Sequence, residues 1–159
     1  MREEVREIID VAEDIAASAE TASTRTTTTI DDESDSDKVI ALWEKAGLLR
    51  PWNDPQKAIT RKLQEMAVNS YSWFWVAETD GVIIAAAMAG YDGHRGSVNY
   101  LGVDPDVQQS GIGRVIMQRI EADLIAAGCP KLNLQVRSDN VDVLAFYDRL
   151  DYQRDATLS

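Results

Sequence analysis

A strand that leads through a glycine-containing loop into a helix constrains the fold of this chain more than any other feature. Residues 97–103 have the pattern of a strand, and apolar residues recur at helical spacing over residues 111–127. Gly128 then ends the helix, and residues 131–137 alternate as a second strand does. Two strands joined through a helix predict a parallel, right-handed strand–helix–strand unit.

The remaining segments place this unit in a mixed α/β sheet within one domain. We expect helices over residues 1–20, from the acidic turn 31–37 to Ala46, from Pro55 to Ala67 and over 141–150, and strands over 23–30, 72–78, 82–91 and 152–158, with an Asp80-Gly81 hairpin turn. The domain is expected to cover residues 23–159. Residues 1–22 form a separate amphipathic helical extension, which packs either on this domain or on a second subunit as a homodimer.

The charge and the cysteine content exclude several functions. The 159 residues include 16 Lys and Arg against 27 Asp and Glu, a net charge of −11. Such a chain repels polyanions, so we expect no nucleic-acid partner, although a local site can hold a small anion. No apolar run approaches the roughly 18 residues that span a bilayer, and no signal peptide is visible. The single cysteine, Cys129, cannot form an internal disulfide, which favours a cytoplasmic location.

The glycine-containing loop is a candidate anion site. Gly111 and Gly113 stand at the start of the helix, where backbone N–H groups lack intrahelical acceptors and the helix dipole is positive. Without side chains there, an anion such as pyrophosphate can approach the backbone. Arg114 follows in place of the Lys of a P-loop, and Ile116 occupies the third glycine position of the dinucleotide fingerprint. A tight turn without a ligand remains the alternative for these two glycines alone.

Two longer patterns resemble the GNAT superfamily of N-acetyltransferases. Gln108, Gly111 and Gly113 have the spacing of its acetyl-CoA loop, Gln/Arg-x-x-Gly-x-Gly/Ala. Asn140, seven residues before Tyr147, looks like the second signature of that superfamily. The two patterns occur in the order, and between the elements, that the superfamily requires.

The resemblance covers roughly residues 24–158 and implies both fold and reaction. Four segments look more narrowly like the small bacterial acetyltransferases of the YpeA type: residues 42–44, 49–55, 90–97 and 128–131. The implied fold is a mostly antiparallel sheet of six to seven strands, with a parallel, splayed pair at the acetyl-CoA site. The implied reaction moves an acetyl group from acetyl-CoA to a primary amine of a small molecule or peptide, by direct attack in a ternary complex.

The resemblance also implies a role for each site residue. The backbone of Leu101 and Val103 binds the pantetheine arm, and an N–H near Leu101 polarises the acetyl carbonyl. Asn140 binds the arm of the cofactor, and Tyr147 protonates the departing thiolate, for which a phenol is an acid of suitable strength. The pyrophosphate is bound by the loop residues Gln108, Gln109, Ser110, Gly111, Ile112, Gly113 and Arg114.

The sequence says less about the residues that bind the acceptor amine. The residues expected to edge the acceptor pocket are Arg50, Trp52, Asn53, Tyr91 and His94. The general base remains open between His94, Asp92 and Glu78, each of which stands at a strand end or in a turn. No metal is implied, and no Cys/His cluster in the sequence suggests one.

Gln108, Gln109 and Ser110 replace the arginines that many relatives carry, which weakens the side-chain contribution to phosphate binding. Four other features favour a different hypothesis: Gln135 replaces the Glu of the ribosomal-protein alanine acetyltransferases, Asp151 replaces a glycine, the seventh strand is expected to be absent or supplied by another segment or subunit, and the helix of residues 1–22 is unexplained. The alternative function is therefore a catalytically weak GNAT-fold module that binds acyl-CoA or a protein partner.

Overall fold

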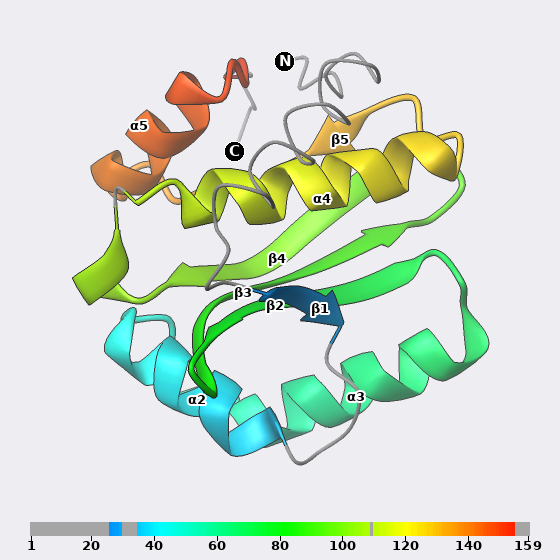
Figure 1. Ribbon diagram of the computed structural model, residues 1–159. Helices are drawn as coiled ribbons and strands as arrows, with labels where there is room; N and C mark the ends of the chain where they lie inside the picture. The colour runs from blue at the N-terminus through cyan, green and yellow to red at the C-terminus, as the bar shows by residue number, and fades with distance from the viewer. Residues whose placement is uncertain (1–25, 30–34, 109, 155–159) are drawn as a thin grey trace.

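The computed structural model describes residues 26–29, 35–108 and 110–154, and in this part five strands form one sheet with helices on both faces (Figure 1). The strands are β1 (Thr26–Thr29), β2 (Ser72–Thr79), β3 (Val82–Tyr91), β4 (Gly96–Val103) and β5 (Leu132–Asn133), and the helices are α2 (Ser36–Lys45), α3 (Pro55–Val68), the 3-10 turn η2 (Pro105–Val107), α4 (Ile112–Ala126) and α5 (Val141–Arg149). The expected helix over residues 1–20 lies outside the described residues.

The sheet has the mixed pairing that the sequence predicts. Its order is β1-β2-β3-β4-β5, the first four strands are antiparallel, and β4 and β5 are parallel. The hairpin between β2 and β3 turns through Asp80 at φ 51° and Gly81 at φ 78°, which matches the Asp-Gly signal. The helix before it starts at Pro55 after Asp54, whose side chain accepts a hydrogen bond from the Lys57 N–H.

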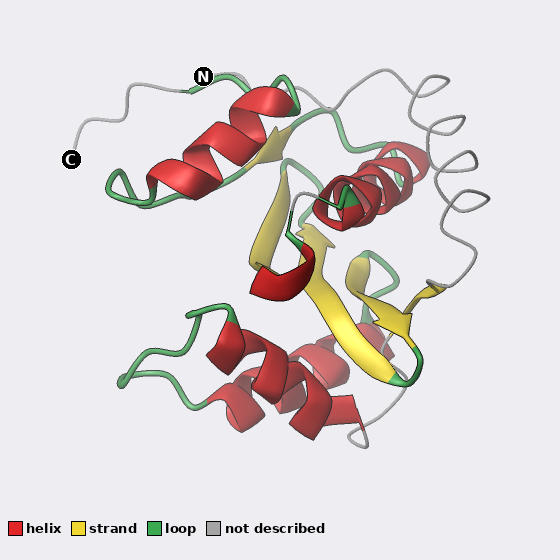
Figure 2. Ribbon diagram, turned by 60° about the vertical axis from the view of Figure 1, so that its left-hand side comes forward, coloured by secondary structure: helices red, strands yellow, loops and turns green. Residues whose placement is uncertain are grey.

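Helices cover both faces of the sheet (Figure 2), and an apolar core lies on each face. On one face, α4 buries Ile116 and Ile120 against the strands. On the other face, α2 and α3 bury Trp43 and Ile59. The central strand β3 is rich in alanine, and these small side chains face both cores. Small residues in the middle layer let the helices of both faces approach the sheet closely.

Two strand predictions differ from the structure. The strand expected over residues 131–137 is only Leu132–Asn133, because its parallel pairing with β4 ends at Ser97, three residues before the bulge of β4. In the strand expected over residues 152–158, residues 152–154 pair with no described strand, and the rest lies outside the description. The buried Tyr152 instead donates a hydrogen bond to Glu121 Oε1 at 2.6 Å. The described part thus contains five strands rather than six or seven.

Candidate active site

A β-bulge shapes the end of β4. Tyr100 and Leu101 together oppose a single residue of β3, Ala87, because the register shifts there by one residue. Tyr100 has φ 54°, and its ring stacks on Trp43 with centroids 4.3 Å apart. The bulge breaks the alternation, because Val98 before it and Leu101 after it both pack against the α4 core, whereas Tyr100 packs against the α2–α3 core. A bulge leaves an extra residue unpaired, and such backbone groups can bind an extended ligand as a strand would.

An ion-pair cluster holds the loop that follows β4. Asp104 accepts hydrogen bonds from the Asp106 N–H at 2.9 Å and from Lys45 Nζ, and Lys45 also pairs with Asp106 at 2.6 Å. These bonds keep the pKa of Asp104 below its ordinary value, with the Asp106 N–H as the larger cause, and they raise the pKa of Lys45. The cluster therefore ties the end of α2 to the start of the loop.

The two loop positions, 111 and 113, require glycine for different structural reasons. Gly111 has φ 88°, and a Cβ added there would meet no atom within 4 Å, so the turn needs glycine for its backbone and leaves open space. A Cβ on Gly113 would lie 3.1 Å from Phe146 Cε1 of α5. The missing side chain of Gly113 therefore makes room for α5, rather than for an anion as the sequence interpretation assumed. Its N–H still belongs to the first turn of α4, where amides lack intrahelical acceptors.

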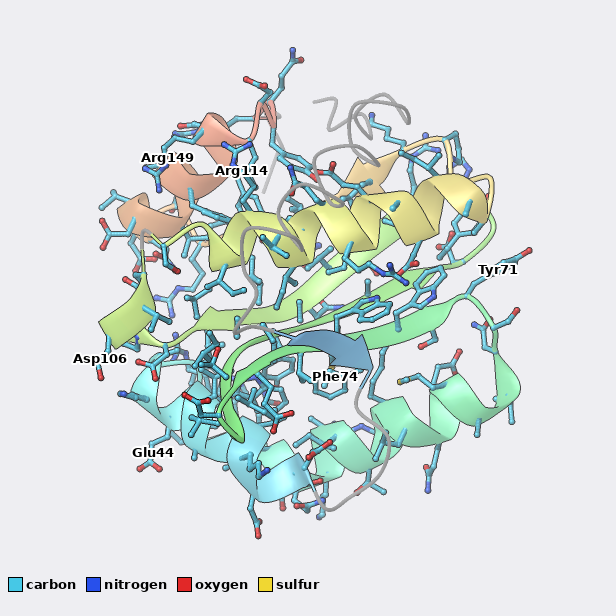
Figure 3. The ribbon with its side chains drawn as sticks, in the orientation of Figure 1. Glu44, Tyr71, Phe74, Asp106, Arg114 and Arg149 are labelled. Carbon is cyan, nitrogen blue, oxygen red and sulfur yellow. The ribbon has the colours of Figure 1, made fainter. Side chains whose placement is uncertain are left out.

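The arginine at the start of α4 reaches a neighbouring helix. Arg114 Nη2 donates a hydrogen bond to the Arg149 carbonyl oxygen at 3.3 Å, at the end of α5. Figure 3 shows Arg114 and Arg149 side by side above the first turn of α4. Both side chains are exposed. The site therefore has two cationic groups near the open helix N-terminus, of which the sequence pointed only to Arg114.

Helix α5 begins and ends with residues of the second signature. Asn140 is its N-cap and accepts a hydrogen bond from the Val143 N–H at 3.3 Å. Tyr147 is 8 % exposed, and its ring makes edge contacts with Phe146 and Tyr152 at centroid distances of 5.1 and 5.5 Å. These rings hold Tyr147 in the core that α4 shares with the sheet.

A cleft of 440 Å³ opens on the α3 face of the sheet. Polar residues form its floor at every second position of β4 and of the chain at and after β5: Ser97, Asn99, Asn133 and Gln135. The residues between them face the α4 core. Its walls come from α3, the start of β2 and the turn between β3 and β4. The paired polar positions on two neighbouring strands are the sequence signal that could have located it.

The acceptor residues expected from the sequence do not all meet in this cleft. Tyr91 and Asp92 line it, whereas His94 lies in the adjoining turn, where its N–H and that of Arg95 donate to Asp92 Oδ1 at 2.8 Å. These backbone hydrogen bonds, that of Arg95 first, lower the pKa of Asp92. The segment with Arg50, Trp52 and Asn53 forms the α2–α3 loop and is absent from the cleft lining.

Arg50, Trp52 and the candidate base Glu78 lie outside the cleft lining. Arg50 Nη1 donates to the carbonyl oxygens of Gly47 and Leu49, and Trp52 is 74 % exposed. Glu78 pairs with Lys38 at 3.6 Å near the end of β2, opposite the strand start that lines the cleft. Within the described ranges, no helix is long and apolar enough to cross a membrane and no cluster of three metal-ligand side chains occurs.

The sheet opens beside the free N-terminus of a helix, with a phenol on a neighbouring helix, which is the arrangement that the sequence resemblance implies for an acyltransferase. The Acetyltransferase (GNAT) family matches residues 38–152. A protein of Yersinia enterocolitica named as an acetyltransferase is 49 % identical over 126 residues, which are 79 % of this chain and 86 % of that protein. The chain therefore belongs to the GNAT family of acetyltransferases.

Solved structures agree with this fold. The ribosomal-protein-S18-alanine N-acetyltransferase of Escherichia coli has a TM-score of 0.68 at 20 % identity, over 83 % of this chain and 79 % of that one. The PaiA N-acetyltransferase of Thermoplasma acidophilum, in complex with coenzyme A, has a TM-score of 0.75 at 14 % identity, over 86 % and 94 %.

Proposed function

We propose that this chain transfers the acetyl group of acetyl-CoA to a primary amine by direct attack in a ternary complex. The observation that carries the proposal is the bulge of β4 at Tyr100 and Leu101, which leads directly to the open first turn of α4. An extended thioester can add its arm to the unpaired backbone of β4 while its phosphates reach the helix N-terminus. The solved relative that holds coenzyme A supports this choice of co-substrate.

The residues around the loop fit a pyrophosphate. Open space surrounds Gly111, so phosphate oxygens can approach the amides of Ile112 and Gly113. Arg114 and Arg149 add positive charge at the same helix end. Asn140 keeps its amide nitrogen for the arm of the cofactor while its oxygen caps α5. Backbone amides and this pair of arginines take the place of the loop arginines of many relatives.

The chemistry needs one acid and one positioned N–H. The amine nitrogen forms a bond to the acetyl carbon, and the developing oxyanion accepts a hydrogen bond from the N–H near Leu101. The carbon–sulfur bond then breaks, and Tyr147 gives its phenolic proton to the leaving thiolate. The protonated nitrogen of the new amide loses its extra proton, which restores the phenol of Tyr147. The cleft on the α3 face supplies the route for the amine, and an ammonium acceptor gives up its proton to solvent in this open cleft before it attacks.

Replacing Tyr147 with Phe tests the acid role. We expect a kcat that is lower by about 10²-fold, the usual scale of general acid catalysis, with a nearly unchanged Kd for acetyl-CoA measured by calorimetry. An unchanged kcat would remove Tyr147 from the mechanism. Tight acetyl-CoA binding by the wild type without turnover on a broad panel of amines would instead favour the non-catalytic acyl-CoA-binding module.

Two glycines that flank α4 provide a matched test of the loop. Gly111 at φ 88° and Gly128 at φ 84° flank opposite ends of the helix, and both face open space. Alanine at either position adds about 1–2 kcal/mol of left-handed backbone strain. Gly111→Ala should weaken acetyl-CoA at least about tenfold, because relief of strain moves the phosphate-binding amides. Gly128→Ala should lose similar stability and keep its affinity; equal affinities in the two variants would contradict the loop assignment.

A further inference from the structure

Two cationic side chains in the cleft of the α3 face lack a counter-ion. Lys62 Nζ donates a hydrogen bond to the Ala89 carbonyl oxygen at 2.7 Å, and Arg95 Nη1 donates to the His94 carbonyl oxygen at 2.8 Å. Within residues 35–108 and 110–154, no carboxylate lies within ion-pair distance of either group. Both cations therefore contact neutral acceptors only.

The two carboxylates of the same cleft are already engaged. Glu65 Oε1 accepts a hydrogen bond from Asn69 Nδ2 at 2.9 Å, one turn further along α3. Asp92 Oδ1 accepts two backbone hydrogen bonds at 2.8 Å each. Each acid therefore has a local partner on its own element. Neither acid forms an ion pair with Lys62 or Arg95, so both cations stay available to an anionic ligand, although the whole chain carries a net charge of −11.

Of the two cations, Lys62 gives the stronger argument for an anionic ligand, because it is half-buried. Its burial lowers its pKa to about 8, and the nearby charge of Glu65 opposes this shift only in part. The other titratable groups along the cleft wall are Tyr71, Tyr91, Asp92 and Arg95. A half-buried ammonium without a counter-ion gains a strong, charge-assisted partner when an anion enters. The cleft is therefore built to favour an anionic group beside Lys62.

The floor of the cleft leads from these cations to the reaction centre. Asn99 and Gln135 carry amides that can both donate and accept hydrogen bonds. Asn99 stands two residues before Leu101 on β4. A small acceptor with its anionic group at Lys62 can therefore extend its amine along Asn99 and Gln135 toward the bulge.

We propose that the acceptor is a small primary amine that also carries a carboxylate or phosphate, and that Lys62 and Arg95 bind this anionic group. The inference rests on the proposed acetyl transfer and specifies its substrate class. Neutral amines and polyamines lack the group that this cleft binds. Lys62 is accordingly a specificity-determining residue, and it takes no part in the bond changes.

Matched pairs of amines test the proposal. The probes are glucosamine 6-phosphate against glucosamine and 5-aminopentanoate against 5-aminopentanamide, assayed by release of the coenzyme A thiol. We expect at least one anionic member to have a kcat/KM about tenfold or more above its neutral partner, the scale of one charge-assisted hydrogen bond. Lys62→Met should remove most of this preference and Lys62→Arg should keep part of it. Lys57→Met, at an exposed position at the start of α3, should behave as wild type.

A binding measurement separates this proposal from the proposed reaction. The ε-carbon of Lys62, followed by NMR, should titrate at a higher pH when glucosamine 6-phosphate is present and should be unmoved by glucosamine. Calorimetry with acetyl-CoA reports on the reaction site independently. Equal use of both members of each pair, an unchanged preference in Lys62→Met, or an NMR titration insensitive to the phosphate would each overturn the anionic-acceptor proposal, whatever the acetyl-CoA result.

Discussion

Replacing Gly113 with Ala should impair turnover more than it impairs folding or cofactor binding. The new Cβ would lie 3.1 Å from Phe146 Cε1, 3.2 Å from Phe146 Cζ and 3.4 Å from Val103 Cγ2. Carbon atoms make ordinary contact at about 3.5–4.0 Å, so the Phe146 ring must withdraw by about 0.4 Å. Phe146 directly precedes Tyr147 on α5, and the whole first part of that helix carries the second signature.

The net effect on stability follows from two opposing contributions. Overpacking of a core typically costs about 1–3 kcal/mol. Replacing a helical glycine with alanine gains at most about 1 kcal/mol. We therefore expect the free energy of unfolding to fall by about 1 kcal/mol, which lowers Tm by about 2–4 °C in a chain of this size.

The effect on catalysis should be larger. A misplacement of about 1 Å in a reacting group can reduce the rate by about 10²-fold, so a shift of roughly half that size should reduce kcat by about tenfold. The Kd for acetyl-CoA should stay within about twofold, because the new methyl group points to α5 and away from the phosphates. Steady-state kinetics, calorimetry and thermal unfolding measure the three quantities.

A second substitution shows whether the ring contact is the cause. Phe146→Leu shortens the side chain that the alanine meets, so the double variant should recover part of the lost kcat. Wild-type turnover in Gly113→Ala, or effects of the two substitutions that simply add, would refute this account of α5 placement.

Two further perturbations probe the supports of the site. Tyr152→Phe removes the 2.6 Å hydrogen bond to buried Glu121, and we expect urea unfolding to report a loss of about 1–3 kcal/mol, with a smaller additional loss when Glu121→Leu is combined with it. Asp104 has a pKa held below 3.8, so its stabilising contribution is complete above that pH and is lost as the pH falls through the lowered value. Urea titrations at decreasing pH should therefore show a smaller loss of unfolding free energy in Asp104→Asn than in wild type. Equal losses in the two proteins would show that Asp104 does not contribute to the pH dependence of stability.

Local signals in the sequence were sufficient for most elements of the sheet and helices. Pro55 after Asp54, the Asp80-Gly81 pair and Gly128 each carry a backbone preference that acts without tertiary contacts, and the structure confirms all three boundaries. The parallel β4–β5 pair followed because α4 separates these two strands, whereas short turns join β2 to β3 and β3 to β4.

The remaining features depend on contacts between residues far apart in the chain, which the alternation of apolar and polar residues does not reveal. Residues 131–137 alternate as a strand does, yet the ladder with β4 ends after Asn133, and β4 bulges three residues further on at Tyr100. A bulge at a tyrosine with φ 54° needs the stacking surface of Trp43, which lies 57 positions earlier in the chain. The cleft escaped prediction for the same reason, since Lys62 and Gln135 meet only when α3 covers the paired strands.

The bulge in β4 links the two halves of the proposed reaction. Before it, Ser97 and Asn99 face the cleft of the α3 side; after it, Leu101 and Val103 face the α4 side, where the helix N-terminus opens. A regular strand would keep the same alternation throughout, so Leu101 and Val103 would face the same side as Ser97 and Asn99. One extra residue thus gives acceptor and thioester separate faces and a shared meeting point, so variants that restore the alternation should abolish transfer even where each ligand still binds.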